Sequence, residues 1–257
     1  MKEIYIHKLS GYCTNCNSRV YITKYNDTCN RCGTFVVNPT LSYKNVWMSP
    51  NTMIQRFSDI ISTHGAQNAV YHKQFQPERE CWISSIWALG LKEIIKREYW
   101  VEIETIDNTP DTYVFYLDIV DGNYHRQVMN IEVVEWEEHT ENIEQVIKKK
   151  CNKNYPNYFY LLIYIRRENV SLEMEKLFKF VQTLQVPFSE IWLVGAESDD
   201  DYVIAKIFPT YTHARFKLSE SLEKNKNQQG FTTIRQRGTG TKITPLGTIY
   251  LPIPDIK

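Results

Sequence analysis

The stretch that decides the fold reads PDTYVFYLDIVDGN at residues 110–123 and continues to IEVVEW at residues 131–136. Both runs are rich in β-branched and aromatic residues, and the pair Asp121-Gly122 separates them. Asp-Gly between two such runs is a strong hairpin signal, because a tight turn needs residues that tolerate positive φ. The stretch therefore predicts two long antiparallel strands that meet at this turn.

Two carboxylates become neighbours in this hairpin. If Asp121 and Gly122 form the loop, the residue numbers of any two facing positions add up to the same total. Asp111 therefore lies opposite Glu132. Directly opposed residues share a sheet face, with Cβ atoms about 4.5–5.5 Å apart, and like charges there destabilise the sheet. A divalent cation between them removes the repulsion, since Mg²⁺ binds through one or two carboxylates. The pair predicts a metal site; an ordinary hairpin with two incidental acids is the alternative.

The hairpin resembles the PD-(D/E)xK nuclease superfamily, in which one strand starts with Pro-Asp and the next carries Glu-x-Lys. Pro110-Asp111 matches the first part and Glu132 matches the second, but Val134 stands where the family has Lys. The resemblance implies a metal-dependent DNA endonuclease in which Asp111 and Glu132 hold Mg²⁺ or Mn²⁺. It also implies that the main-chain carbonyl of Val133 is a further ligand.

The resemblance implies a third acid on the helix before the first core strand, and Glu80 is the candidate. Its alternative role is a simple charge at a helix start. The missing motif lysine has three explanations. Glu135, Gln145 or Lys148 replaces it, although Glu135 needs a β-bulge to reach the same sheet face. Alternatively, the site works slowly without a lysine, or the fold binds nucleic acid without cutting it.

The segment at residues 1–40 is predicted to be a zinc ribbon. It contains two CxxC pairs separated by twelve residues, and the four thiols are Cys13, Cys16, Cys29 and Cys32. Zn²⁺ prefers four tetrahedral ligands, and CxxC turns supply thiolates in pairs. Such a small module obtains its folding free energy from the metal. A structural Zn²⁺ is therefore expected, and a redox dithiol is the alternative.

Helix and strand signals alternate after the ribbon. Besides the hairpin, we expect helices at 52–64, 77–96, 140–150 and 171–184, and strands at 99–104, 158–165, 190–195 and 202–208. This alternation predicts an α/β fold. The resemblance implies a restriction-endonuclease-like mixed sheet flanked by helices and preceded by the zinc ribbon. The expected parts are the ribbon at 1–40, a connecting helical segment at 41–76, a nuclease-like core at 77–218 and a polar C-terminal extension at 219–257.

Composition constrains the partners only weakly. The chain has 30 Lys plus Arg and 30 Asp plus Glu, so its formal net charge is zero and gives no support to a DNA partner. Local basic clusters such as Lys148-Lys149-Lys150 leave that partner open. No run of about 18 apolar residues occurs, so no membrane span is expected. The first residues lack the apolar core of a signal peptide, which favours a cytoplasmic protein.

The leading prediction is a metal-dependent DNA endonuclease acting in restriction, phage defence or a mobile element. Trp100 and Trp136 flank the predicted site and are candidates for base stacking. One alternative is a catalytically inactive nuclease-fold subunit that binds DNA, which Val134 favours. The other is a protein-interaction component that docks a larger complex through the ribbon or the C-terminal extension, which the neutral charge favours mildly.

Overall fold

The computed structural model describes residues 9–12, 19–22, 42–103, 110–120, 123–155, 158–167, 170–236 and 240–245. The chain divides into two compact units, one formed by Met1–Trp47 with Gln229–Pro252 and the other by Met48–Gln228 with Ile253–Lys257. This division differs from the boundaries expected at residues 40, 76 and 218. The first helices after the ribbon segment belong to the larger unit, whereas two strands of the C-terminal extension belong to the smaller one.

The strands described in the smaller unit pair antiparallel. β1 (Leu9–Tyr12) pairs with β2 (Arg19–Ile22). A second sheet has the order β12-β11-β3 and is built from β3 (Ser42–Trp47), β11 (Phe231–Gln236) and β12 (Gly240–Pro245). Part of the C-terminal extension is therefore paired in a sheet with a strand from the start of the chain. Cys13, Cys16, Cys29 and Cys32 lie outside the described residues.

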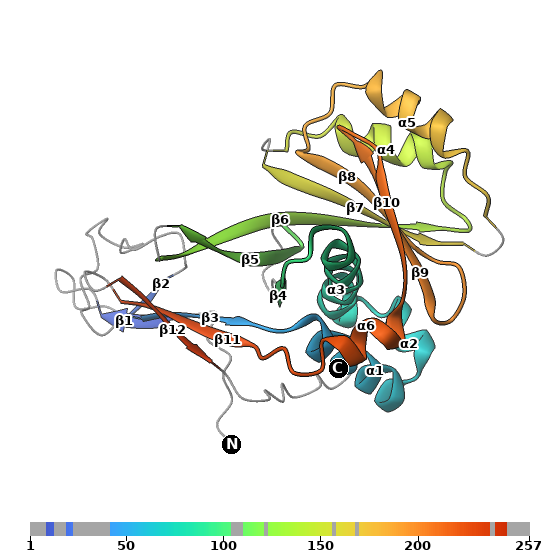
Figure 1. Ribbon diagram of the computed structural model, residues 1–257. Helices are drawn as coiled ribbons and strands as arrows, with labels where there is room; N and C mark the ends of the chain where they lie inside the picture. Colours follow the sequence, from blue (N-terminus) through green and yellow to red (C-terminus); the bar gives the residue numbers. More distant parts are fainter. Residues whose placement is uncertain are drawn as a thin grey trace. The chain divides into compact units, whose positions relative to one another are not determined.

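A mixed sheet of seven strands dominates the larger unit, with the order β10-β9-β8-β7-β6-β5-β4 (Figure 1). β7 runs parallel to both β6 and β8, and the other pairs are antiparallel. The strands are β4 (Trp100–Ile103), β5 (Thr112–Val120), β6 (Asn123–Glu137), β7 (Phe159–Arg166), β8 (Glu190–Ala196), β9 (Asp201–Phe208) and β10 (Thr212–Lys217). Three strands that the sequence did not predict, β10, β11 and β12, follow the one that ends at Phe208.

The hairpin register predicted from the sequence is confirmed. β5 and β6 pair from Val120 opposite Asn123 to Thr112 opposite Ile131. The two residue numbers of every facing pair therefore add up to the expected total. Asp111 lies immediately before β5, and its N–H donates to the carbonyl of Ile131 over 2.9 Å. The ladder therefore becomes irregular just where the first carboxylate stands.

Helices cover both faces of the mixed sheet (Figure 1). Their bounds are α1 (Pro50–His64), α2 (Ala66–Tyr71), a 3₁₀ turn (Lys73–Phe75), α3 (Gln76–Ile95), α4 (Ile143–Cys151), α5 (Met174–Gln182) and α6 (Leu218–Lys224). On one face, Trp82 and Trp87 of α3 pack against Tyr164 and Tyr160 of β7. On the other, α4 and α5 share a core with β6, β7 and β8 through Ile143, Ile147, Leu177 and Val181. The α/β class with a helix-flanked mixed sheet is thus confirmed.

The start of α4 differs from the sequence prediction. The sequence predicts that the helix starts at Thr140, but Asn142 is the N-cap residue, because its side-chain oxygen accepts a hydrogen bond from the Gln145 N–H over 2.9 Å. The Thr140 hydroxyl instead donates to the Glu137 carbonyl over 2.7 Å and stabilises the turn before the helix. Both are good capping residue types, so the sequence alone did not separate them.

Candidate functional site

Glu132 lies in β6 on the face that α4 covers, and it is almost completely buried at 5% exposure. Its Oε1 accepts hydrogen bonds from Lys150 Nζ at 2.5 Å and from the Tyr155 hydroxyl at 2.7 Å. Its Oε2 is buried and has no hydrogen-bond partner among the described residues. An unpartnered buried carboxylate oxygen is costly unless a cation or a water serves it. Glu132 therefore has one oxygen held in place and one oxygen available.

Asp111 stands beside Glu132, as the hairpin register predicts. Its Oδ2 accepts a hydrogen bond from the Val133 N–H over 2.8 Å, which fixes the carboxylate across the end of the ladder. Burial, followed by the charge of Glu132, raises the pKa of Asp111 to about 6. The Val133 N–H and the charges of Lys150 and Lys153 oppose that rise. The two acids thus repel each other even with lysines nearby.

Glu80 adds a third carboxylate from α3 and is 9% exposed. Its Oε1 accepts a hydrogen bond from Gln76 Nε2 over 2.7 Å. Burial is the largest cause that raises the pKa of Glu80, to about 8, and the charge of Asp111 is the next. Charge effects thus link Glu80 to Asp111 and Asp111 to Glu132, while Glu80 comes from α3 and Glu132 lies on the sheet face that α4 covers.

The position of the missing motif lysine is filled by core packing. Val134 packs against the apolar cluster between β6 and the helices α4 and α5. Lys150 is the basic residue that donates to Glu132, and it is not among the substitutes expected from the sequence. A signal for it exists, because Ile143, Ile147 and Lys150 are spaced by four and three residues and share one helix face. Since the two isoleucines are buried, that face points towards β6.

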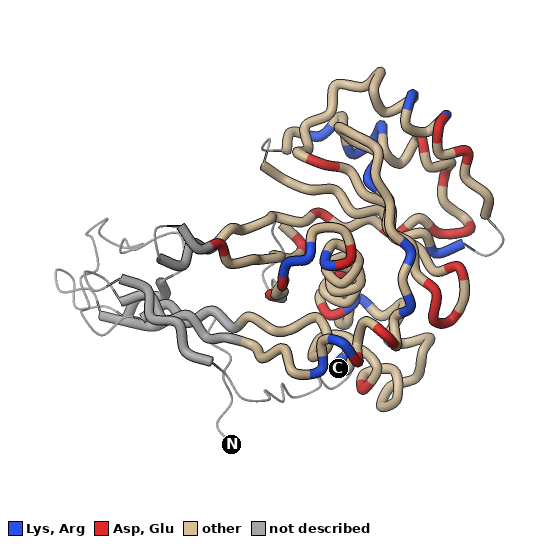
Figure 2. The backbone as a smooth tube through the Cα atoms, viewed as in Figure 1, with Lys and Arg blue, Asp and Glu red and all other residues tan. Residues whose placement is uncertain are grey.

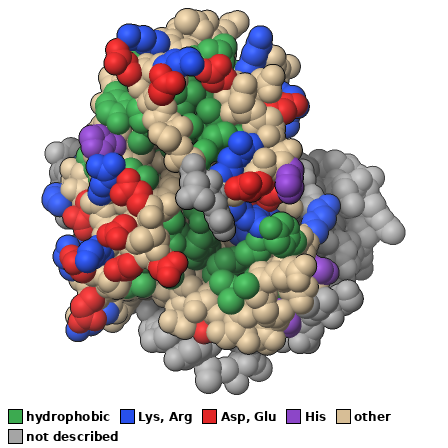
Figure 3. Space-filling model, turned by 90° about the vertical axis from the view of Figure 1, so that its right-hand side faces the viewer, with side chains coloured by type: hydrophobic (Ala, Val, Ile, Leu, Met, Phe, Trp, Pro, Cys, Tyr) green, Lys and Arg blue, Asp and Glu red, His purple; other side chains and the backbone are tan. Residues whose placement is uncertain are grey.

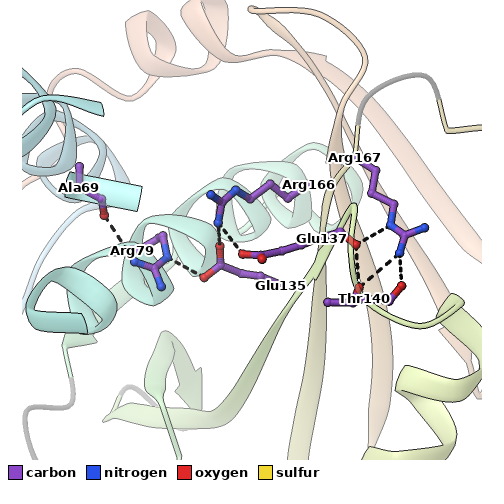
Figure 4. A network of polar contacts seen from close by, with 7 residues as sticks. All are labelled: Ala69, Arg79, Glu135, Glu137, Thr140, Arg166 and Arg167. Carbon is purple, nitrogen blue, oxygen red and sulfur yellow. Dashed lines mark hydrogen bonds and ion pairs between the residues drawn. The ribbon is translucent and has the colours of Figure 1, made fainter. Parts of the chain in front are cut away.

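The three substitutes proposed from the sequence are placed elsewhere. Gln145 and Lys148 are exposed on α4. Glu135 belongs to an ionic network in which it accepts from Arg79 at 2.6 Å and from Arg166 at 2.9 Å (Figure 4). The charges of Arg79 and Glu135 also act on Glu80. Both arginines are largely buried, so this network is structural. No bulge turns Glu135 towards Glu132.

The two tryptophans considered for base stacking are not available for it. Trp100 and Trp136 are each only 4% exposed. The Trp136 ring is covered by the Arg167 guanidinium at 4.1 Å, and its N–H donates to the Glu141 carbonyl. Arg167 in turn donates to main-chain carbonyls of Glu137 and Thr140 (Figure 4). The expectation of stacking by these rings was wrong, because they are core residues.

Oxygen ligands of this kind suit a hard cation such as Mg²⁺ or Mn²⁺. Within the described ranges, no three or more His, Cys, Asp or Glu side chains are already arranged as a metal group. At Glu132, the Lys150 ammonium supplies the positive charge that a cation supplies. The unpartnered Oε2 of Glu132 and the second oxygen of Asp111 are the donors that fit a metal.

The wider comparisons add no constraint on this site. No helix in the part of the chain that the structure describes has the length and apolar character needed to span a membrane. The chain matches no protein-family model, no curated protein and no solved structure.

Proposed function

We propose that the protein is a metal-dependent DNA endonuclease of the PD-(D/E)xK type. The observation that supports this most is Asp111 beside Glu132 at the start of β5, with Lys150 donating to Glu132 and the charge of Asp111 acting on Glu80. Burial and a neighbouring carboxylate raise the pKa of both Asp111 and Glu80, which is unfavourable for the fold alone, and such perturbed groups cluster at functional sites. A cation is therefore a good explanation for a hairpin that places Asp111 beside Glu132.

Each side chain has a distinct role in this proposal. Asp111 and Glu132 hold Mg²⁺ or Mn²⁺, which when bound supplies charge neutralisation and a water of lowered pKa. Tyr155 holds Glu132 in one orientation through its hydroxyl. Lys150, released from Glu132, donates to a phosphate oxygen and offsets the negative charge that develops there. Glu80 orients a water beside Asp111.

The N-terminal cysteines complete the proposal. Cys13, Cys16, Cys29 and Cys32 hold a structural Zn²⁺, and the ribbon that they form contacts DNA or a partner protein. A DNA endonuclease with such a module fits restriction, phage defence or a mobile element. The spacing of the four cysteines is the observation that supports the zinc site.

Cleavage of DNA is the direct test. Purified protein is incubated with supercoiled plasmid and with labelled single strands, in Mg²⁺, Mn²⁺ or EDTA. We expect metal-dependent cleavage that Asp111→Asn abolishes, because a ligand is lost. Asp118→Asn is the matched control, since Asp118 lies on β5, the strand that Asp111 precedes, and pairs with Arg97 instead. Cleavage that survives Asp111→Asn, or that proceeds in EDTA, contradicts the proposal.

The second candidate is a nuclease-fold subunit that binds DNA without cutting it. Val134 favours it, because the residue at the family's lysine position is apolar and packed. The two candidates differ in one result. Protein that retards DNA in gels but leaves every substrate intact in Mg²⁺ and Mn²⁺ supports the binding subunit.

A further inference from the structure

The neutral total charge of the chain is the sum of two oppositely charged units. The smaller unit, Met1–Trp47 with Gln229–Pro252, contains nine Lys and Arg against two Asp and Glu, so its formal net charge is +7. The larger unit, Met48–Gln228 with Ile253–Lys257, contains 21 against 28, which gives −7. One Zn²⁺ with four thiolates adds −2 and leaves the smaller unit at +5. A basic part of this kind is the electrostatic footprint of a nucleic-acid-binding domain.

The three strands of the sheet β12-β11-β3 carry only basic charges. They contain Lys44, Arg235 and Lys242, and their sequences contain no Asp or Glu. Lys44 and Lys242 both lie opposite Ile234, each from one of the two strands that pair with β11. Because directly opposed residues share a sheet face, the two lysine positions flank Ile234 on the same face.

The face with the two lysine positions is the polar one. Trp47, opposite Phe231, is fully buried, so its face is the buried one at that end of the strand. Successive residues of a strand alternate between faces, which places Lys44 and Lys242 on the side away from Trp47. The other positions on that side include four residues with hydrogen-bonding side chains, Ser42, Thr232, Gln236 and Thr244. Lys, Ser, Thr and Gln are residue types that commonly contact DNA phosphates.

The larger unit has a different distribution of charge. Along its elements, Lys and Arg alternate with Asp and Glu (Figure 2), and on the face in Figure 3 the two signs are intermixed. Several of its basic side chains are paired with carboxylates, for example Arg79 with Glu135 and Lys206 with Glu190. A unit with an excess of negative charge repels the DNA backbone. The affinity for DNA is therefore expected to come mainly from the smaller unit.

We infer that the polar face of the sheet β12-β11-β3, on which Lys44 and Lys242 lie, binds the phosphate backbone of DNA without reading its sequence. This inference rests on the proposed nuclease function, because it assigns that enzyme a surface for docking DNA. Lys44 and Lys242 each contact a phosphate, and the counterions that are released provide a salt-dependent affinity. The larger unit contributes the proposed metal site, and the smaller unit contributes the affinity.

Fluorescence anisotropy in EDTA tests the inference without any cleavage. Two labelled duplexes of equal length and different sequence are titrated with the full-length protein over a range of salt concentrations. We expect equal affinities for the two duplexes. Lys44→Gln with Lys242→Gln should weaken binding about tenfold and reduce the salt slope by roughly 1.8, at about 0.9 per phosphate contact. Lys44→Arg with Lys242→Arg keeps both charges, so it should keep the affinity and the slope.

Two matched controls separate this face from a general effect of charge. Lys73→Gln with Lys176→Gln removes two exposed lysines from the larger unit and should change neither the affinity nor the salt slope. Gln236→Glu adds a negative charge on the lysine face, whereas Asn45→Asp adds one on the face of Trp47. The first change should weaken binding about threefold, and the second should weaken it clearly less.

Unchanged affinity and salt slope in Lys44→Gln with Lys242→Gln overturn the inference, and so does an equal loss of affinity in Lys73→Gln with Lys176→Gln. Sedimentation tests for the other anionic occupant, which is the acidic unit of a second copy. Salt-sensitive self-association that Lys44→Gln with Lys242→Gln abolishes, while DNA binding persists, assigns the face to that copy and overturns the inference.

The result is separable from the nuclease test, because binding is measured without a metal. DNA binding that follows these variants in a protein that cuts nothing upholds the docking face and removes the enzyme. Metal-dependent cleavage by a protein whose DNA binding ignores these variants upholds the enzyme and removes the docking face.

Discussion

Lys150 in α4 donates a hydrogen bond to Glu132 in β6 over 2.5 Å, although the two residues are eighteen positions apart in the chain. The Glu132 side chain is 6% exposed and that of Lys150 is 20% exposed, so the contact is largely shielded from water. The ammonium therefore supplies positive charge at the carboxylate to which the proposed cation would bind. Exchange of this ammonium for a metal is the central chemical expectation for the site.

Lys150→Gln tests that exchange. In EDTA, the variant should lose on the order of 2–4 kcal/mol of unfolding free energy, because a buried carboxylate loses its charged partner. Mn²⁺ should restore more stability to the variant than it adds to the wild type, since the metal takes the place of the ammonium. Urea unfolding with EDTA or Mn²⁺ measures both effects. Lys149→Gln, which breaks an exposed pair, should cost no more than about 1 kcal/mol. A variant that Mn²⁺ leaves equally unstable contradicts the exchange.

Tyr155→Phe tests whether Glu132 needs its second donor. Burial raises the pKa of Tyr155, so its hydroxyl stays protonated and donates to Glu132 at neutral pH. Loss of a group that orients a metal ligand typically costs about 10–100-fold in metal affinity. We expect the Kd for Mn²⁺ to rise by about tenfold, with a stability loss of only about 1 kcal/mol. Calorimetric titration measures the affinity. Tyr211→Phe, at an exposed tyrosine, should leave it unchanged, and an unchanged Kd in Tyr155→Phe rules out the positioning role.

The sequence determined the hairpin well because the signals involved are local. An Asp-Gly turn fixes the register of the strands around it, and the register then places Asp111 beside Glu132. The contact of Lys150 with Glu132 depends instead on how α4 lies across the sheet, which is a tertiary property. Only the spacing of Lys150 from two buried isoleucines hinted at it.

The missed strands have a similar explanation. β10 lies at the sheet edge, where only Phe216 is buried, so Thr212–Lys217 shows little of the apolar pattern by which strands are recognised. β11 pairs with β3, which lies near the opposite end of the chain, and no local signal encodes such a pairing. The placement of the C-terminal extension could therefore not be predicted from the sequence.

Gly90 is expected to be required for the packing of α3. A Cβ at this position would lie 2.7 Å from Ile204 Cδ1 and 2.9 Å from Phe216 Cε1, closer than real contacts allow. Alanine gains about 1 kcal/mol of helix propensity over glycine, but overpacking costs about 1–3 kcal/mol. Gly90→Ala should therefore destabilise the larger unit in urea unfolding. Gly195→Ala is the control, because its nearest neighbour lies at 3.6 Å. A Gly90→Ala variant more stable than the wild type contradicts this packing.

Zinc should be present in the purified protein at one ion per chain. Cys16→Ser or Cys29→Ser should release it and unfold the ribbon, because the metal supplies the folding free energy of such a module. The larger unit should stay folded, since it has its own core. Metal analysis and thermal melting measure the two effects. Cys151→Ser, at a free thiol of the larger unit, should retain the zinc. Freshly purified protein without zinc argues decisively against the ribbon.

Glu80→Gln should change how stability depends on pH in metal-free protein. The pKa of Glu80 rises from 4.5 to about 8 in the fold, mainly through burial and then through Asp111. A folded-state pKa above the unfolded value means that stability is fully present below about pH 4.5 and is lost as pH rises through about 8. Glutamine never ionises, so the variant avoids that loss.

The variant and the wild type should therefore have similar stability near pH 5. By pH 8.5 the variant should be more stable by on the order of 1–3 kcal/mol. Urea unfolding in EDTA across this range measures the difference. Glu93→Gln on the same helix is the control, because Glu93 is 28% exposed and pairs with Lys96. It should produce no such divergence. If Glu80→Gln is less stable than the wild type at pH 8.5, the Glu80 carboxylate is held by a structural partner, and its place among the three repelling acids is lost.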